Sequence, residues 1–284
     1  MIQIHFLNLG AGVQSTVLYL MAVKKFARTF RLDVAGFADT QEEPTEVYEH
    51  LSRLATAGNH HVPILVRSVG KLGDDLIAGR NSLGHRFVPI PAFTAPDERL
   101  AASREGRLRR QCTKEYKTEV MTKLIRRELL DVPKYGRVPK DVHVVQYFGI
   151  SVDEARRSRS IIKRFEKIKW STPSFPLLEM NMTRADCINW LSLHWPYPVA
   201  RSACVFCPYK SDSEWLWMKA NDSIGWNRAV EIDRGLRAGN VMSRRLDQKM
   251  YLHRSCTPLE LVELQPTRKS IPSFATECEG VCGV

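Results

Sequence analysis

Apolar residues gather along the chain in two alternating kinds of segment. Short, continuous apolar runs of the kind that form buried strands cover residues 2–9, 32–38, 62–66 and 142–148. Apolar side chains recur at helical spacing in residues 15–26, 42–57, 113–130, 183–194 and 211–238. Strands that alternate with helices in this way predict right-handed βαβ units and a parallel sheet. The chain is therefore expected to be an α/β protein.

Two segments interrupt the alternation. Residues 79–111 contain several Gly and Pro residues and little periodicity, and a loop of that length inside a compact domain is usually functional. Residues 195–210 form a second loop, which contains Pro and Cys. We expect an α/β domain over residues 1–180, including the long loop, and a Cys-rich, mostly helical region over residues 181–284.

Composition narrows the class of protein. The 284 residues are 44% apolar and 26% charged, as is ordinary for a globular protein, and no apolar run approaches the roughly 18 residues that span a bilayer. We therefore expect no membrane contact. The first apolar run follows no basic region and ends in a glycine turn, so it predicts a strand rather than a signal peptide. The seven cysteines are then expected in a reducing cytoplasm, where metal or redox roles are more frequent than disulfides.

The positive charge is concentrated in one quarter of the chain. The whole protein has a formal net charge of +11, and residues 101–170 hold 19 Lys and Arg against 9 Asp and Glu, a net of +10. Such a concentration favours an anionic partner, either a nucleotide or a nucleic acid. A solvated helix face with a positive bias is the alternative interpretation.

A glycine turn follows the first predicted strand. It reads Gly10-Ala11-Gly12-Val13-Gln14-Ser15-Thr16. Small residues between a strand and a helix let backbone N–H groups approach a phosphate, and the helix N-terminus adds partial positive charge. The turn is neither a Walker A loop nor a GxGxxG motif. It therefore predicts phosphate binding, with a tight turn and a Ser or Thr helix cap as the alternative.

This turn resembles the PP-loop of the adenine-nucleotide α-hydrolase superfamily, Ser-Gly-Gly-x-Asp-Ser, with direct matches at Gly12 and Ser15. Gln14, in place of the Asp, resembles the phosphoadenosine phosphosulfate (PAPS) reductase branch. Two further segments resemble the same branch: Asp39-Thr40 and residues 149–159. The resemblance to phage and bacterial PAPS-reductase-like proteins covers nearly the whole chain, including 110–117 and 204–208. DNA-phosphorothioation sulfur-transfer proteins are more distant relatives.

The resemblance implies a fold and a nucleotide site. The family fold is a doubly wound parallel sheet that binds its nucleotide at the carboxyl ends of the strands. The resemblance implies that the glycine turn holds an adenine nucleotide, which is ATP, adenylyl sulfate (APS) or PAPS. It also implies that Asp39 lies near the adenosine or Mg²⁺ and that the C-terminal region closes the site. The nucleotide-binding residues implied are Gly10, Ala11, Gly12, Gln14, Ser15, Thr16, Asp39, Thr40, Gly149, Arg156, Arg157 and Arg159.

The cysteines predict a metal centre. Cys204 and Cys207 have the Cys-x-x-Cys spacing that lets two thiolates bind one metal or cluster. Cys112 lies among Arg and Lys residues, which lower a thiol pKa and favour an anionic cluster. These three cysteines are predicted ligands of a [4Fe–4S] cluster; Cys282 is the preferred fourth ligand, followed by Cys278 and Cys256. Zn²⁺ suits four thiolates as well by ligand type.

The three-plus-one ligand set resembles the cluster of the assimilatory sulfonucleotide reductases. Those enzymes carry an adjacent Cys-Cys pair, whereas Thr113 follows Cys112 here. PAPS reductases also carry a C-terminal Glu-Cys-Gly segment whose thiolate attacks sulfur, and Glu277-Cys278-Glu279-Gly280 matches it in part. Cys278 is therefore the preferred nucleophile, and Cys282 is the alternative. Cys187 is expected in the hydrophobic core.

Three functions remain open on these grounds. The first is an APS or PAPS reductase, served by a thioredoxin-like reductant. The second is an ATP-dependent sulfurtransferase that thiolates tRNA or DNA, with sulfur supplied by a partner such as a cysteine desulfurase. The third is a Zn-stabilised basic nucleic-acid-binding module, which would leave the glycine turn without a role. Adenine-nucleotide-dependent sulfur chemistry covers the first two.

Overall fold

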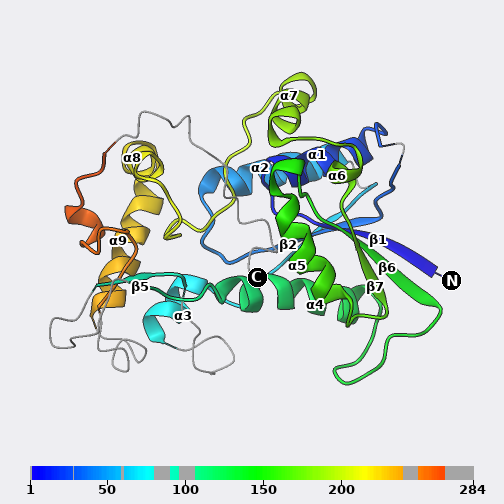
Figure 1. Ribbon diagram of the computed structural model, residues 1–284, viewed down its shortest axis with the longest axis horizontal. Helices are drawn as coiled ribbons and strands as arrows, with labels where there is room; N and C mark the ends of the chain where they lie inside the picture. The colour runs from blue at the N-terminus through cyan, green and yellow to red at the C-terminus, as the bar shows by residue number, and fades with distance from the viewer. Residues whose placement is uncertain are drawn as a thin grey trace.

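A five-stranded parallel sheet forms the centre of the molecule (Figure 1). The computed structural model describes residues 2–27, 29–58, 61–79, 90–95, 106–238 and 249–265. The strand order is β3-β2-β1-β6-β7, with every pair parallel. The strands are β1 (Ile2–Asn8), β2 (Val34–Ala38), β3 (Ile64–Arg67), β6 (Val142–Tyr147) and β7 (Ser171–Ser174).

Helices cover both faces of this sheet. On one face lie α1 (Val13–Val23) and α2 (Thr45–Gly58), with α6 (Pro176–Glu179) and α7 (Arg184–His194) packed against α1. On the other lie α5 (Ala155–Phe165) and the continuous helix η1 (Lys114–Thr118), α4 (Glu119–Lys123) and η2 (Leu124–Leu129). The predicted α/β class with a parallel sheet is confirmed, and helices on both faces are compatible with a doubly wound fold.

A second hydrophobic core lies beside the parallel sheet, on the left of Figure 1. It is built from α3 (Leu72–Ala78), α8 (Asp212–Asn221), α9 (Ser223–Arg237) and η5 (Leu259–Leu261). A small antiparallel sheet in the order β5-β4-β8 joins them, from β5 (Gly106–Arg107), β4 (Phe93–Thr94) and β8 (Met250–Tyr251).

The two cores draw on interleaved parts of the chain. Helix α3 precedes residue 180 yet packs in the second core, whereas α7 follows residue 180 and packs on α1. The division into domains 1–180 and 181–284 stays a prediction. Neither core contains a helix long and apolar enough to cross a membrane, as far as the described residues extend.

Candidate functional site

The glycine turn lies where the sheet changes its winding direction. Strand β1 leads through the turn into α1 and on to β2 at one side, and β6 leads through α5 to β7 at the other. In an open α/β sheet, the crevice at the carboxyl ends of two such strands is the usual ligand site. The two turns come close there: a Cβ added to Gly149 would lie 2.7 Å from the backbone N of Ser15. The close backbone approach requires glycine at that position.

The polar side chains of the turn bond to neighbouring segments. The Gln14 amide donates to Ser151 Oγ at 3.4 Å and to Glu154 Oε2 at 3.2 Å, and its carbonyl accepts from Arg184 Nη1 at 2.8 Å. Gln14, Ser15 and Thr16 are all buried. The side chains thus hold the turn in place.

Two further contacts complete the turn. The Ser15 hydroxyl donates to the Gly12 carbonyl at 3.3 Å, and Thr16 Oγ1 lies 2.9 Å from His50 Nε2. Gly12 caps α1 without a side-chain hydrogen bond, and Ala11 has a positive φ of 57°. The N-terminus of a helix carries partial positive charge, which favours an anion there.

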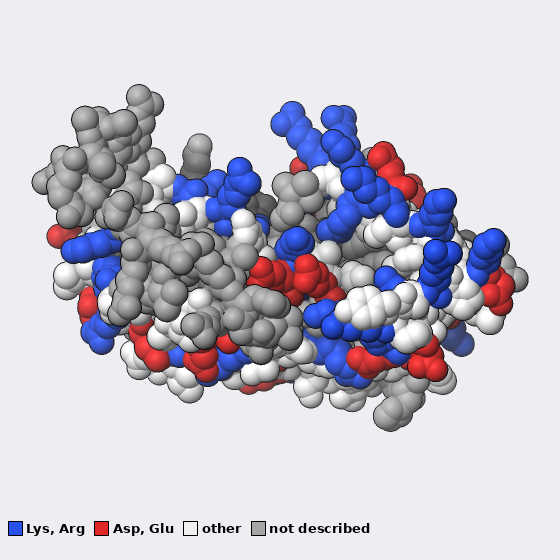
Figure 2. Space-filling view, turned by 90° about the horizontal axis from the view of Figure 1, so that it is seen from below, with Lys and Arg blue, Asp and Glu red and all other residues white. Residues whose placement is uncertain are grey.

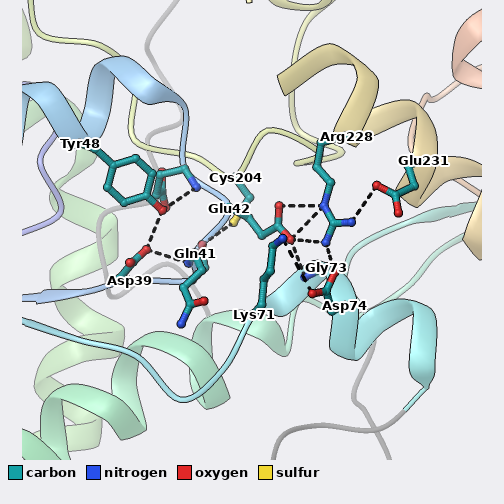
Figure 3. Close-up of polar contacts among 12 residues, drawn as sticks. Asp39, Gln41, Glu42, Tyr48, Lys71, Gly73, Asp74, Cys204, Arg228 and Glu231 are labelled. Atoms are coloured by element: carbon teal, nitrogen blue, oxygen red, sulfur yellow. Dashed lines mark hydrogen bonds and ion pairs between the residues drawn. The ribbon is translucent and has the colours of Figure 1, made fainter. Parts of the chain in front are cut away.

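Asp39 and Thr40 follow β2 and lie at the same edge of the sheet. Asp39 Oδ1 accepts from the backbone N of Gln41 at 2.7 Å and from the Tyr48 hydroxyl at 2.9 Å (Figure 3). Burial and the Asp39 carboxylate raise the pKa of Tyr48, which therefore remains a hydrogen-bond donor. Thr40 Oγ1 lies 3.2 Å from Cys204 Sγ, which connects the end of β2 to the Cys-x-x-Cys loop.

The three predicted arginines lie at the start of α5 in different surroundings. Arg156 and Arg159 are exposed. Arg157 is half-buried, and its Nη1 lies 2.6 Å from Glu154 Oε1, on the carboxylate that also accepts from Gln14. Arg157 therefore supports the glycine turn through Glu154, whereas the other two present their charge to solvent.

Cys112, Cys204 and Cys207 line one cavity of about 410 Å³, counted to its open mouth. Cys112 comes from the start of the helix that covers one sheet face, and the other two come from the loop before α8. Arg110 and Lys117 line the cavity as well. The structure thus brings together the three cysteines that the sequence predicts as ligands, beside two cations.

Thr113 contributes an unusual group to this cavity. Its hydroxyl oxygen is buried and has no hydrogen-bond partner within the part of the chain that the structure describes. Burying a hydroxyl without a partner costs free energy, so native structures rarely leave one.

No described group of three or more His, Cys, Asp or Glu side chains is arranged to hold a single metal ion. The three thiols therefore share a cavity without forming a compact mononuclear site. Burial raises the pKa of Cys204 well above its usual value, the Glu43 carboxylate adds to this, and the Lys117 ammonium opposes it. A bound cation at the thiol would reverse that balance by stabilising the thiolate.

Lys117 connects the cysteine cavity with the carboxyl end of the parallel sheet. A second crevice, about 240 Å³ in volume, is lined by Gly10 and Ala38 at the ends of β1 and β2, and Lys117 lines it too. The Lys117 ammonium lies 3.2 Å from Glu43 Oε1, with both side chains almost fully buried, and Ser202 Oγ donates to the same carboxylate at 3.3 Å. Sequence reasoning missed this pair, because Glu43 and Lys117 lie far apart in the chain.

An arginine links the second core to the end of the sheet. Arg228 of α9 donates to both oxygens of the buried Glu42 carboxylate and also bonds to Asp74 and Glu231 (Figure 3). The backbone carbonyl of Glu42 accepts from the N of Val205 at 2.7 Å, inside the Cys-x-x-Cys loop. Glu42 therefore fixes where the loop, and so its two cysteines, lies relative to β2.

The remaining cysteines lie elsewhere. Cys187 is fully buried in the core between α1 and α7, which confirms its predicted place. Cys256 is half-buried, has a φ of 52° and does not line the cysteine cavity. The predicted nucleophile Cys278 and the predicted fourth ligand Cys282 lie outside the described residues.

Part of the basic stretch has structural roles. Arg126 and Arg127 donate to backbone carbonyls of the following loop, and Arg157 pairs with Glu154. Figure 2 shows other Lys and Arg side chains standing on the face seen from below, with Asp and Glu among them. A surface of mixed sign with an excess of positive charge remains for an anionic partner.

Comparisons with protein-family models, curated proteins and solved structures find no match to this chain.

Proposed function

We propose that this protein is an enzyme of adenine-nucleotide-dependent sulfur chemistry that holds a [4Fe–4S] cluster on Cys112, Cys204 and Cys207. One observation carries the proposal: three cysteines from two distant segments line a single cavity, and Lys117 lines both this cavity and the crevice beside Gly10. A nucleotide at the ends of β1 and β2 would therefore lie next to the sulfur ligands.

The cavity suits an anionic, thiolate-ligated cluster. The ionisable side chains among the described residues that line it are the three cysteines, Arg110 and Lys117. Arg110 and Lys117 place positive charge beside the negative charge that such a cluster carries. A single Zn²⁺ draws its thiolates to about 2.3 Å and so requires a tighter group than a cluster does. When bound, the cluster would supply a redox-active or sulfur-coordinating centre.

The nucleotide would be held by backbone groups at the start of α1, with Arg156 and Arg159 as exposed cations and Asp39 as the group closest to a bound Mg²⁺ or adenosine. The leading reaction is that of an APS or PAPS reductase. A thiolate, with Cys278 preferred over Cys282, attacks the sulfur and forms an S–S bond. The S–O bond to the nucleotide breaks, releasing AMP or its 3′-phosphate. A thioredoxin-like dithiol then reduces the thiosulfonate, releases sulfite and is itself oxidised to a disulfide.

The second candidate is ATP-dependent thiolation of tRNA or DNA. The excess of exposed cations favours it, because a nucleotide needs few cations whereas a polyanion contacts many. Here an acceptor oxygen attacks ATP, pyrophosphate leaves, and a sulfur nucleophile then displaces AMP.

The cluster is tested by anaerobic purification with iron, sulfide and absorption measurements. We expect about four irons per chain. Cys112→Ser, Cys204→Ser and Cys207→Ser should each lose most of the iron. Cys187→Ala, which removes a core cysteine remote from the cavity, should keep all of it. A colourless protein with stoichiometric zinc, or full iron in any of the three Ser variants, would overturn the ligand assignment.

The reaction is tested by incubation with ATP, APS and PAPS in the presence of a dithiol reductant. Sulfite release without pyrophosphate is the expected result for the reductase. Pyrophosphate release from ATP that depends on tRNA or DNA selects the thiolation reaction instead. If none of the three nucleotides binds or reacts, the proposal of adenine-nucleotide chemistry is wrong.

A further inference from the structure

A large second cavity lies on the other side of the Cys-x-x-Cys loop. It has a volume of about 1290 Å³, counted to its open mouth, and lies between the start of α2, the loop after α7, and α8. It shares no lining residue with the cysteine cavity or with the crevice beside Gly10. Nothing proposed above uses it, so an inference about it stands apart from the proposed function.

Two aromatic side chains in this cavity remain open to solvent. Trp217 of α8 is 46% exposed and Tyr197 is 45% exposed, although both are large rings that proteins generally cover. The guanidinium of Arg53 lies 4.8 Å from the centroid of the Tyr197 ring, which holds that ring in place. Because Arg53 already lies over the Tyr197 ring, the exposed Trp217 ring is the principal stacking surface for a planar ligand, and Tyr197 is the second ring on the cavity wall.

The net charge of the side chains that line the cavity is opposite in sign to the net charge of the whole protein. Four carboxylates and three cations line it, although the chain has a net charge of +11. Arg53 pairs with Glu49 at 3.0 Å, and Arg201 pairs with Glu214. These pairs leave Glu46, Asp222 and Lys210 as the charges that face a ligand. A wall of this composition disfavours a polyphosphate and favours a ligand that donates hydrogen bonds.

Glu46 is the clearest hydrogen-bond acceptor. Its carboxylate makes no hydrogen bond or ion pair with another residue in the described ranges. Burial raises the pKa of Glu46, and the neighbouring Asp222 and Glu49 carboxylates raise it further. Asp222 Oδ1 caps α9 by accepting from the N of Gly225 at 2.9 Å, which leaves its second oxygen for a ligand. Both carboxylates gain from a neighbouring donor.

We propose that this cavity binds a nucleobase that carries an exocyclic amino group, stacked against Trp217 and Tyr197 and donating to Glu46 and Asp222. Carboxylates accept from the amino group of cytosine, and aromatic rings stack on any base. The pairing with Glu46 selects cytosine over uracil, which has a carbonyl at the corresponding position. The base belongs either to a free nucleoside or to a single-stranded nucleic acid.

Calorimetry with cytidine and uridine tests the proposal on the full chain. Cytidine carries no phosphate and no adenine, so it does not report on the glycine turn. We expect cytidine to bind about tenfold more tightly than uridine, because one well-placed hydrogen-bonded pair discriminates to that degree. Trp217→Ala should weaken cytidine binding by about tenfold through lost stacking. Glu46→Gln should remove the preference for cytidine.

Matched controls are available on the surface. Tyr135 is 89% exposed and Glu166 is exposed, and neither lines the cavity, so Tyr135→Ala and Glu166→Gln should leave cytidine binding unchanged.

A short oligocytidylate separates the two sources of the base: tighter, salt-dependent binding indicates a nucleic acid, and binding equal to that of cytidine indicates a nucleoside. Equal affinity for cytidine and uridine, absence of binding at millimolar cytidine, or full binding by Trp217→Ala would overturn the proposal.

Discussion

The glycine turn and the cysteine cavity lie at the same end of the parallel sheet, yet they use their side chains in opposite ways. In the turn, Gln14 and Thr16 bond to neighbouring segments and are buried. In the cavity, the Thr113 hydroxyl has no partner among the described residues, and three thiols converge without forming a disulfide. The polar side chains of the turn are therefore used within the fold, whereas the cavity gathers thiols that form no disulfide.

Different constraints explain the contrast. A phosphate is bound by N–H groups, so the side chains of the turn are free to fix its position. A thiolate-ligated centre would use the cysteine side chains as ligands. The Cys-x-x-Cys loop that carries two of them is held by backbone contacts, such as the hydrogen bond from Val205 N to Glu42 O at 2.7 Å. Substitutions in the turn should therefore affect stability, and cysteine substitutions should affect metal content. The three measurements below test the stability of the turn and of the ion pair beside the cavity, and the iron content of the cysteine variants tests the other half of the division.

The largest effect is expected for Lys117→Met. Lys117 and Glu43 form a buried ion pair between the two parts of the site, and removing one partner leaves an uncompensated buried carboxylate. We expect the free energy of unfolding to fall by about 3–5 kcal/mol, measured by urea denaturation. Lys114→Met is the control on the same helix: Lys114 is 75% exposed and 4.0 Å from Glu119, so the change should be below about 1 kcal/mol. Equal effects of the two substitutions would contradict the role of the pair.

A smaller effect is expected from lowering the pH. Burial, with a contribution from the Arg53 charge, lowers the pKa of His50 from 6.5 to about 4, and its Nδ1 has no partner within the described residues. The folded state favours neutral His50, so this contribution is complete above pH 6.5 and is lost as the pH falls towards 4.

Urea denaturation at pH 7 and at pH 4 measures this loss. Relative to His50→Asn, which does not titrate, the wild-type protein should lose about 3 kcal/mol of unfolding free energy between the two pH values. Because His50 contacts Thr16, nucleotide affinity should fall with it. Parallel pH profiles for the two proteins would show that His50 is not buried in its neutral form.

The smallest effect is expected for Gly149→Ala. The added Cβ would lie 2.7 Å from Ser15 N and 3.0 Å from the Gln14 carbonyl carbon, both backbone atoms that move only with the turn. We expect a loss of about 1–3 kcal/mol in unfolding free energy and weaker ATP binding. Gly235→Ala on α9 is the control, because the nearest atom there, at 3.0 Å, belongs to the Ile77 side chain. An unchanged urea midpoint for Gly149→Ala would mean that the two turns do not approach as described.

The parallel sheet could be predicted from the sequence because its strands and helices carry local signals. The strand-like run 142–148 became β6 (Val142–Tyr147), and the helical spacing of 113–130 became one continuous helix from Lys114 to Leu129. Strand β7 was missed because Ser171–Ser174 contains Pro173 and no apolar run. A strand at the edge of a sheet tolerates such a proline.

The second core was missed for a different reason. Strands β4 and β8 have two residues each and pair across more than 150 positions, so no local pattern reveals them. Glu43 and Lys117 were hidden in the same way, since they lie 74 positions apart and only the fold brings the segment before α2 to η1. The spacing of Cys204 and Cys207 was readable, but their place beside Cys112 depended on the packing of the second core.

The order of strands also has a consequence for synthesis of the protein. Ile2 of β1 pairs with Val142 of β6, 140 positions later, although β1 is the middle strand of the sheet. At about 5–20 residues per second on the ribosome, one edge of β1 waits on the order of ten seconds for its neighbour. An open strand edge attracts other chains, so a nascent-chain chaperone that covers β1 during this interval should raise the yield of correctly folded protein.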